Sequence, residues 1–406
     1  MITVEEAQTR IIESLAAHLP STETLSLADV LDRVLAESIC SDLDIPPFDN
    51  SAMDGYAVRS DVFASRTAEY PIRLKVVGTS AAGHPISARG ISPVQCYRIM
   101  TGAPVPEDAD AVVQSEWTQL DPEEKDVIWV SRPVPKGLNI RRQGSDISNG
   151  SAVLAPGTRI TPAIIGILAT LGKSRVTVYQ KPLVAIISTG DELIDPDQTP
   201  MPGQIRNSNA YALHAAVCKA GGHPIIIPHA PDHLATIIAR LDQASQYDLI
   251  LSSGGVSVGD FDFVKQALDA NGTQAFWRVN MKPGKPVTFG HYRHTAIFGL
   301  PGNPVSALVT FELFVRPFIR QWQGDTQWAR MVVPLPLLDD FEEISDRRHY
   351  VRCQIRTQDG VVGVTANPDQ GSAIQTSWLA AGGLMVIPEN QGPWKKGSLV
   401  PVMLLH

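Results

Sequence analysis

The chain has 406 residues, of which 44% are hydrophobic and 19% charged, an ordinary composition for a globular protein. This length is too great for one compact core and predicts two to four domains. The net charge of −8 argues against a protein that coats nucleic acid, although it leaves room for a local basic pocket. No apolar run approaches the roughly 20 residues that cross a bilayer.

The N-terminal stretch MITVEEAQTRIIESL carries acidic residues and lacks the apolar core of a signal peptide. The cysteines are widely spaced and form no CxxC pair, so neither a zinc site nor a disulfide framework is indicated. These are Cys40, Cys96, Cys218 and Cys353. We therefore expect a cytoplasmic protein that contacts no membrane.

The N-terminal region predicts short helices. Thr3 followed by Glu6 fits a capping box, and a second short helix is predicted over residues 27–36. Pro162 opens another helix, which ends near Gly172 and whose isoleucines need a helical partner. Short β-branched runs rich in Gly and Pro fill the sequence between these flanks. We predict a discontinuous helical linker domain (1–44 and 147–180) that carries an inserted β-rich domain (45–146).

Apolar strands and helices alternate over residues 181–326. This pattern predicts a central doubly wound α/β domain with a mainly parallel sheet that is covered on both faces. The expected strands are 182–188, 223–228, 247–251, 274–279, 287–289 and 295–298, and the expected helices are 208–220, 232–244, 263–270 and one beginning at 304. Residues 327–406 return to β character, with an Asp359-Gly360 hairpin, and predict a C-terminal β-barrel-like domain.

Three loops rich in small or charged residues follow predicted strands, at 188–192, 252–262 and 299–306. Ligands bind beyond the carboxyl ends of strands in such sheets, so we expect a site there. Gly254-Gly255 suits close approach of backbone amides to a phosphate, or is an ordinary turn. Lys282 and Lys285 in the KPGKP loop are solvated lysines or, as we favour, cations that bind an oxyanion.

Carboxylates gather in the same predicted loops. Asp191, Glu192, Asp232 and Asp262 offer enough oxygen ligands for a Mg²⁺ ion that keeps several waters, although any single one could be structural. Polar loops also occur in the β-rich region, where turns capped by Asp or Asn are the simpler explanation. These loops are FDNSAMDGYAV (48–58), MTGAPVP (100–106) and IRRQGSDI (140–147).

These strings together resemble a known family. FDNSAMDGYAV, MTGAPVP, SSGGVSVGDFDF with KPGKP, and GLPGNPVSA are similar to motifs of molybdopterin molybdenumtransferases, the molybdenum-insertion enzymes related to the C-terminal domain of gephyrin. STGDEL (188–193) and QGS (370–372) follow the same order, so the resemblance spans nearly the whole chain. The chain departs from the family pattern at Ser145, where Glu is usual, and at Arg206, where Tyr is common.

The resemblance implies an enzyme that takes adenylylated molybdopterin and molybdate, cleaves the phosphoanhydride with Mg²⁺, and releases molybdenum cofactor and AMP. It implies a cytoplasmic homodimer of four-domain subunits with a shared active site, and possible contact with the adenylylating enzyme of the pathway. Asp54, Thr101 and Asp146 of one subunit would then reach the α/β cleft of the other.

The remaining roles are assigned on the same resemblance. Glu192 and Asp262 join the catalytic set, and the metal ligands are Asp232, Asp262 and Glu192. The pterin nucleotide is assigned to Thr189, Gly190, Gly254, Gly255, Ser257, Pro301 and Asn303. Molybdate is assigned to Lys282, Lys285, Ser306, Ser372 and an arginine of the RRHYVR stretch (347–352), of which Arg352 is favoured.

Three other functions are considered. A gephyrin-like scaffold without catalysis is disfavoured by the complete set of Asp54, Asp262, Lys282 and Lys285. A tungstate-inserting paralogue stays open, because both oxyanions have nearly the same size and charge. The sister adenylylating enzyme is usually the α/β domain alone, so the additional domains here favour insertion.

Overall fold

A computed structural model describes residues 1–16, 18–64, 70–84, 90–255 and 263–405. The described chain divides into two compact units. The first unit comprises Met1–Glu37, Pro156–Gly166 and Ser174–His406, and the second comprises Ser38–Ala155 and Ile167–Lys173.

A six-stranded sheet organises the first unit, in the order β16-β13-β17-β21-β20-β18. The first four of these strands are parallel, whereas β20 and β18 run antiparallel to their neighbours. Nearly every residue of β13, β17 and β21 is buried, as expected for strands covered on both faces. The strands are β13 (Leu183–Ser188), β16 (His223–Ile226), β17 (Leu249–Ser253), β18 (Gly272–Trp277), β20 (Thr288–Tyr292) and β21 (Thr295–Leu300).

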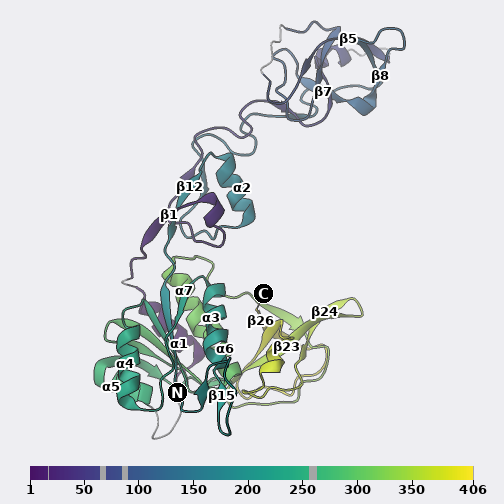
Figure 1. Cartoon of the computed structure of the whole chain (residues 1–406). Helices are drawn as coiled ribbons and strands as arrows, with labels where there is room; N and C mark the ends of the chain where they lie inside the picture. The colour runs from purple at the N-terminus through teal and green to yellow at the C-terminus, as the bar shows by residue number, and fades with distance from the viewer. Residues whose placement is uncertain (17, 65–69, 85–89, 256–262, 406) are drawn as a thin grey trace. The chain divides into compact units, whose positions relative to one another are not determined.

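Helices cover both faces of this sheet (Figure 1). One face packs against α3 (Ser208–Ala220), α6 (Pro304–Thr310) and α7 (Arg316–Trp322). The other face packs against α4 (Leu234–Ala244) and α5 (Phe263–Asn271). The predicted stop of α3 is confirmed, because Gly221 adopts the left-handed conformation there, at φ 99°. The predicted doubly wound architecture is confirmed.

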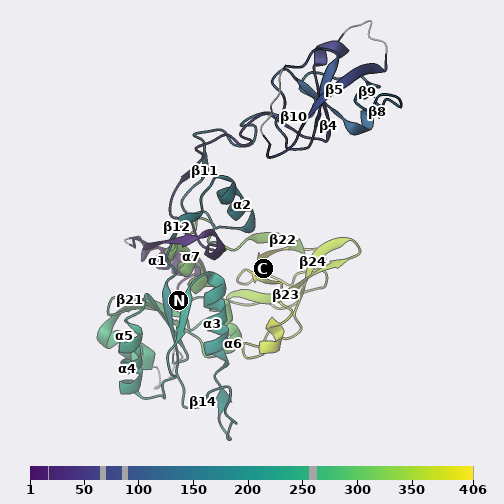
Figure 2. The same cartoon turned by 45° about the horizontal axis from the view of Figure 1, so that its top comes forward.

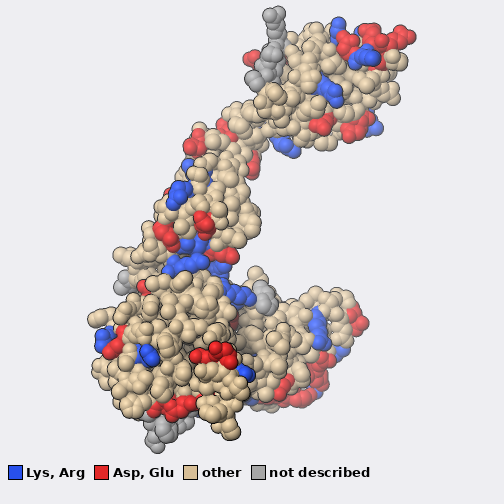
Figure 3. Space-filling model, viewed as in Figure 1, with Lys and Arg blue, Asp and Glu red and all other residues tan. Residues whose placement is uncertain are grey.

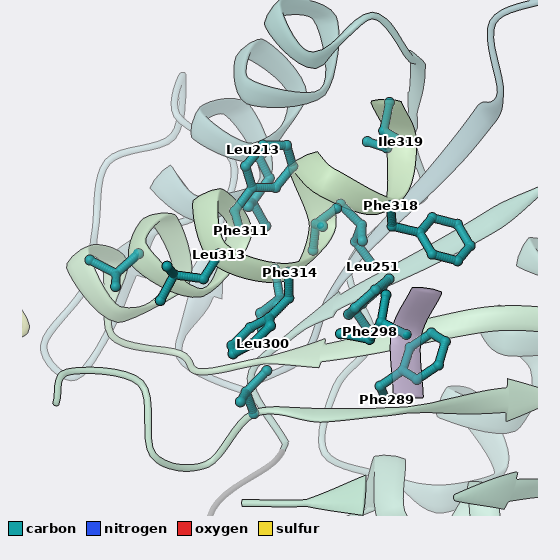
Figure 4. Packing of buried hydrophobic residues seen from close by; sticks show 14 of the residues in the cluster. Leu213, Leu251, Phe289, Phe298, Leu300, Phe311, Leu313, Phe314, Phe318 and Ile319 are labelled. Atoms are coloured by element: carbon teal, nitrogen blue, oxygen red, sulfur yellow. The ribbon is translucent and has the colours of Figure 1, made fainter. Parts of the chain in front are cut away.

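Aromatic rings fill the core beneath α7 (Figure 4). The ring of Phe298 lies 4.7 Å from that of Phe289 and 5.5 Å from that of Phe318, measured between centroids. A π-helical turn, Phe311–Val315, joins α6 to α7 and adds Phe311 and Phe314 to the same cluster. These tilted and edge-on contacts are the favoured geometry of aromatic pairs.

The N-terminal helix α1 (Val4–Glu13) begins at the predicted capping box, in which the Thr3 and Glu6 side chains accept hydrogen bonds from each other's backbone N–H groups. Its buried residues Val4, Ala7 and Ile11 belong to the core of the α/β sheet. Strands, rather than a second helix, follow it. β1 (Thr22–Ser26) pairs antiparallel with β12 (Arg175–Tyr179).

The helix predicted over residues 27–36 is wrong. Only the 3₁₀ turn Leu27–Asp29 forms, after which Asp32 takes a positive φ of 63° that ends helical geometry. Val34 and Leu35 then form β-bridges with Arg159 and Val178. The helix predicted after Thr161 is present as α2 (Pro162–Thr170). The flanks within the first unit are therefore joined by strand pairing.

A five-stranded path with one added strand forms the C-terminal sheet, in the order β19-β23-β25-β26-β22 with β24 on β23. Figure 2 labels β22, β23 and β24 of this sheet. The predicted hairpin at Asp359-Gly360 is confirmed, since both residues have positive φ between β23 and β24. Tyr350 and Leu384 join the core of the α/β sheet. The elements are β19 (Met281–Lys282), β22 (Val332–Pro336), β23 (Arg348–Gln358), β24 (Val361–Ala366), the 3₁₀ turn Gln375–Trp378, β25 (Gly383–Ile387) and β26 (Leu399–Leu404).

The second unit is β-rich, with a six-stranded sheet in the order β7-β4-β6-β5-β9-β8. Separate buried clusters pack around it, one containing Phe63 and Leu74 and the other Ile91 and Ile99. On the face seen in Figure 3, acidic and basic side chains are interspersed over this unit. The sheet strands are β4 (Gly55–Val58), β5 (Ile72–Ser80), β6 (Gln95–Ile99), β7 (Ala111–Gln114), β8 (Thr118–Leu120) and β9 (Val127–Val130).

Short elements complete both units. In the second unit β2 (Ile39–Cys40) pairs with β11 (Ala152–Leu154), and β3 (Asn50–Ser51) with β10 (Ile140–Arg141). Its 3₁₀ turns are Ser60–Phe63 and Ser115–Trp117, and β14 (Leu193–Ile194) pairs with β15 (Ile205–Arg206) in the first unit. The predicted multidomain α/β plus β fold class is confirmed, while the domain boundaries stay predictions. Within the described ranges no helix combines the length and apolarity that a bilayer crossing requires.

The aromatic core supplies a stability prediction. Phe298 is fully buried. Its replacement by Ala should lower the free energy of unfolding of the α/β domain by about 3–5 kcal/mol, because the change removes ring contacts and leaves a cavity. Urea denaturation followed by tryptophan fluorescence measures this change. Leu379, which is 87% exposed, is the control, and its replacement by Ala should change stability by less than about 0.5 kcal/mol. Equal effects of the two changes would contradict the prediction.

Candidate active site

Three parallel strands bring their last residues to one edge of the α/β sheet. Ser188 of β13 pairs with Ser253 of β17, which in turn pairs with Leu300 of β21. Backbone hydrogen bonds then hold the residues that follow two of these strands. The Thr189 N–H donates to the Ser253 carbonyl at 3.1 Å, and the Gly254 N–H to the Leu300 carbonyl at 3.1 Å. The three predicted loops therefore start from one row of paired residues.

Gly254 fits its place because of both conformation and space. Its φ is 93°, and a Cβ atom there would lie 2.7 Å from the Thr189 carbonyl oxygen. Any side chain would push apart the two loops that border the edge of the sheet. The small residues after β17 therefore allow the loops at 189 and 254 to approach each other.

A cleft of about 770 Å³ opens at this edge. Every described residue that we assigned to the pterin nucleotide lines it, together with the acidic residues Glu192 and Asp232. The predicted members are Thr189, Gly190, Gly254, Gly255, Pro301 and Asn303. The predictions for Ser257 and Asp262, and the neighbouring Asp260, lie outside the described residues.

The start of α3 forms another wall of this cleft, which we did not predict. Asn207 caps the helix by accepting a hydrogen bond from the Ala210 N–H, and Asn209 donates to Ser253 Oγ and to the Gly302 carbonyl, both at 2.8 Å. Asn209 thus joins the end of β17 to the loop after β21. The motif GQIRNSN (203–209) contained the signal, but an Asn before a helix usually indicates only a cap.

Carboxylates meet at one end of the cleft. Burial raises the pKa of Asp232, and the nearby charges of Asp191 and Glu192 raise it further. The Asp191 carboxylate accepts the Asp232 N–H at 2.9 Å, which opposes this shift. Repulsion among hard oxygen ligands suits a divalent cation such as Mg²⁺. The described residues contain no group of three His, Cys, Asp or Glu side chains arranged to hold a metal.

A second cleft of about 570 Å³ adjoins the first. Pro286, Pro301 and Asn303 line both. Four of the residues that we assigned to molybdate line the second cleft, and so does Arg347, another arginine of the RRHYVR stretch that was predicted to supply a cation. The four are Lys282, Lys285, Ser306 and Ser372.

The loop that carries the two lysines has little freedom. The Val279 N–H donates to the Lys285 carbonyl at 3.1 Å, which closes the loop. Gly284 has a φ of 106°, and a Cβ atom there would lie 2.5 Å from Thr310 Cγ2. Only glycine fits without moving α6. The backbone that carries the two lysine side chains is therefore held in place, as the KPGKP pattern predicts.

Arg352 is placed differently from the other oxyanion candidates. It is fully buried, and it is not among the described residues that line the second cleft. Its Nη2 donates to the carbonyls of Asp369 and Gly371, at 3.1 and 3.3 Å. It therefore holds the loop that supplies Gly371 and Ser372 to the cleft.

The C-terminal sheet and the α/β domain meet through hydrogen bonds at the clefts. Asn303 Nδ2 donates to Ser372 Oγ at 3.0 Å, and the Val305 N–H donates to the Ser372 carbonyl at 3.1 Å. Gln375 Nε2 donates to Ser208 Oγ at 3.0 Å and also lines the first cleft. Sequence gave no indication of the role of Gln375, because its partner lies 167 residues earlier.

The remaining predicted catalytic residues, Asp54, Thr101 and Asp146, belong to the second unit. Asp54 and Thr101 are in direct contact, since the Thr101 N–H and hydroxyl both donate to Asp54 Oδ1, at 2.6 and 2.8 Å. These bonds lower the pKa of the Asp54 carboxyl, the backbone N–H having the larger effect. Asp146 is exposed, and its N–H donates to the Ile45 carbonyl at 3.0 Å.

Comparisons with known proteins agree along the whole chain. Residues 2–172 match the MoeA N-terminal region (domain I and II), residues 185–321 a probable molybdopterin binding domain, and residues 334–405 the MoeA C-terminal region (domain IV). A molybdopterin molybdenumtransferase from Bacillus subtilis is 37% identical, covering 95% of this chain and 90% of the relative. One from Haemophilus influenzae is 36% identical, covering 99% and 98%.

Solved structures show the same architecture. The crystal structure of the molybdopterin biosynthesis MoeA protein from Pyrococcus horikoshii OT3 superposes with a TM-score of 0.84 at 30% identity, covering 100% of both chains. Fold, clefts and sequence together define a multidomain transferase whose central domain is of the molybdopterin-binding type. The chain belongs to the molybdopterin molybdenumtransferase family.

The contact between Asp54 and Thr101 supplies a pKa prediction. Thr101→Val removes the hydroxyl donor and should raise the pKa of the Asp54 carboxyl towards its ordinary value, while the remaining backbone N–H keeps it below that value. Carboxyl carbon shifts followed by NMR over a pH titration measure this change. The pKa of Asp121, lowered by its own hydrogen bonds, should not move and is the control. An unchanged Asp54 pKa in the variant would contradict the assignment.

Proposed function

We propose that this chain inserts molybdenum from molybdate into adenylylated molybdopterin, with Mg²⁺-dependent cleavage of the phosphoanhydride that releases AMP and forms molybdenum cofactor. One observation carries the proposal. The cleft at the carboxyl ends of the strands and the cleft lined by lysines share Pro286, Pro301 and Asn303. A pterin nucleotide in the first would therefore adjoin an oxyanion in the second.

The first cleft suits a phosphorylated nucleotide. The loops after β13, β17 and β21 meet at its wall, and the small residues Gly190, Gly254 and Gly255 expose backbone to a ligand. The start of α3 forms another wall of the cleft and presents the positive end of its helix dipole. This arrangement favours the phosphoanhydride over a neutral ligand.

The second cleft suits a tetrahedral dianion such as molybdate. The charges of Lys282, Lys285 and Arg347 favour an anion, and the hydroxyls of Ser306 and Ser372 can donate to its oxygens. Arg352 acts behind them by holding the loop that carries Ser372. The protein thus contributes positioning and charge stabilisation, without a covalent nucleophile.

Magnesium belongs to the same proposal. Glu192 and Asp232, which both line the first cleft, would hold the ion together with Asp262. When bound, Mg²⁺ neutralises charge on the phosphoanhydride as AMP departs. Burial raises the pKa of Asp232 most, and the charges of Asp191 and Glu192 raise it further; a shared cation would relieve that repulsion, which supports this assignment.

The proposal extends to the assembly and its setting. We place the chain in the cytoplasm as a homodimer that receives its substrate from the adenylylating enzyme of the pathway. Asp54, Thr101 and Asp146 would complete the cleft of the partner subunit. Two observations support a role for this unit: the ordered contact between Asp54 and Thr101, and the match of residues 2–172 to the N-terminal region of the family.

Reconstitution tests the reaction. Purified protein incubated with adenylylated molybdopterin, molybdate and Mg²⁺ should release AMP and form active cofactor, and chelation of Mg²⁺ should stop both. Lys282→Ala should lower the rate about 100-fold or more at low molybdate, because it removes a cation from the oxyanion cleft. Lys396→Ala, which changes an exposed lysine in the turn before β26, is the matched control and should retain wild-type rates. AMP release without Mg²⁺, or an active Lys282→Ala enzyme, would refute the mechanism.

Complementation tests the shared active site. Asp54→Ala and Lys285→Ala should each be inactive alone, but a mixed dimer would contain one site with both native residues. Random assembly of equal amounts makes half of the dimers mixed, and one of the two sites in each mixed dimer keeps both native residues, so the mixed dimers should recover about half of the wild-type activity. Co-expression with two affinity tags and assay of the doubly tagged fraction measures this. No recovery in that fraction would indicate that both residues act within one subunit.

A further inference from the structure

One lysine of the oxyanion cleft is already paired with an anion from the protein. The Lys282 ammonium forms an ion pair with Glu343 Oε1, and both side chains are 36% exposed. Glu343 lies 61 residues further along the chain, between β22 and β23. None of the roles assigned above uses this carboxylate.

The pair is held by the backbone around it. Lys282 of β19 is the register partner of His349 of β23 in a parallel pairing that joins the α/β domain to the C-terminal sheet. Glu343 Oε2 lies 3.7 Å from His349 Nδ1, so the carboxylate bridges two residues of adjacent strands. The arrangement is built by tertiary pairing and is more than a chance meeting of flexible side chains.

His349 does not neutralise the carboxylate. Its side chain is 1% exposed, and within the described chain neither ring nitrogen has a hydrogen-bond partner. Burial lowers the pKa of His349 to about 4, so the ring is uncharged at neutral pH. No positive charge on His349 therefore offsets the Glu343 carboxylate, whose charged partner is the Lys282 ammonium.

An oxyanion in the second cleft would have to share the Lys282 ammonium with Glu343. Two like charges near one cation repel each other, and the repulsion grows in proportion to the charge of the bound anion. Partial exposure and salt reduce the effect without removing it, because the groups lie within a Debye length. Glu343 thus weakens the cleft for a dianion more than for a monoanion.

We propose that Glu343 limits the oxyanion affinity of the second cleft by competing for the Lys282 ammonium. This role rests on the proposed function, which puts molybdate in that cleft. It suits a transfer reaction, because tight binding of the free oxyanion lowers its energy in the ground state and adds to the barrier for its transfer. Glu343 acts through Lys282 and is a positioning residue, not a catalytic one.

Glu343→Gln tests the proposal in the full-length protein. Isothermal titration calorimetry with tungstate and perrhenate compares two tetrahedral oxyanions of similar size, one a dianion and the other a monoanion. The Kd of the variant should fall about fivefold for tungstate and about twofold for perrhenate, the dianion gaining roughly the square of the monoanion's factor. A merely structural disturbance would change both alike or weaken both.

Glu342→Gln is the matched control, since it makes the same chemical change one residue away and Glu342 pairs with Lys395 instead. It should leave both Kd values unchanged. Placing Glu343→Gln on a Lys282→Ala background should give a clearly smaller gain, because the competed cation is absent and only the direct repulsion remains. An equally large gain there, or unchanged or weaker tungstate binding in the single variant, would overturn the proposal while leaving the oxyanion site standing. Wild-type tungstate affinity in Lys282→Ala alone would refute both.

Discussion

The candidate site depends on the parallel register of β13, β17 and β21. Their hydrogen bonds align Ser188, Ser253 and Leu300 in one row, so three loops leave the sheet at the same level. If one strand were shifted by a single residue, its buried side chains would turn to the opposite face. The buried Val, Ile and Leu residues of these strands therefore fix the position of the first cleft as well as the stability of the domain.

A second constraint is the two-residue pairing of β19 with β23. It adds a strand from the α/β region to the C-terminal sheet and brings Lys282 beside His349. The hydrogen bonds of Ser372 to Asn303 and Val305 tie the same surfaces together from the other side. Polar links of this kind are modest individually, but they hold the two walls of the oxyanion cleft at a defined separation. The linings of the two clefts are consequently continuous with each other.

Local sequence was sufficient where a pattern had only one reasonable structure. Apolar runs predicted the strands. Gly221, directly after the predicted helix 208–220, indicated where α3 stops, and Asp359-Gly360 predicted the C-terminal hairpin. Local sequence failed over residues 27–36, whose apolar spacing is compatible with a helix, because tertiary bridges to Arg159 and Val178 prevailed over helix propensity.

The site divides in the same way. Glycine-rich loops and the KPGKP stretch predicted the lining of both clefts, since their composition reports directly on backbone shape and charge. Gln375 and Glu343 could not be predicted, because Gln375 reaches the first cleft, and Glu343 reaches Lys282, only through contacts between segments far apart in the chain. A lone charged residue in such a segment looks the same as a solvated one.

The position of α1 affects how the polypeptide can acquire its structure. Gln8 donates to the Leu313 carbonyl and Arg10 to the Ala275 carbonyl, while Val4, Ala7 and Ile11 fill the core under the π-helical turn. During synthesis, α1 leaves the ribosome long before the residues that bury it are made. The helix therefore cannot pack until about 300 more residues have been synthesised. A fragment that begins at Lys181 would lack α1 and would expose the apolar surface that α1 covers. It would therefore be prone to self-association.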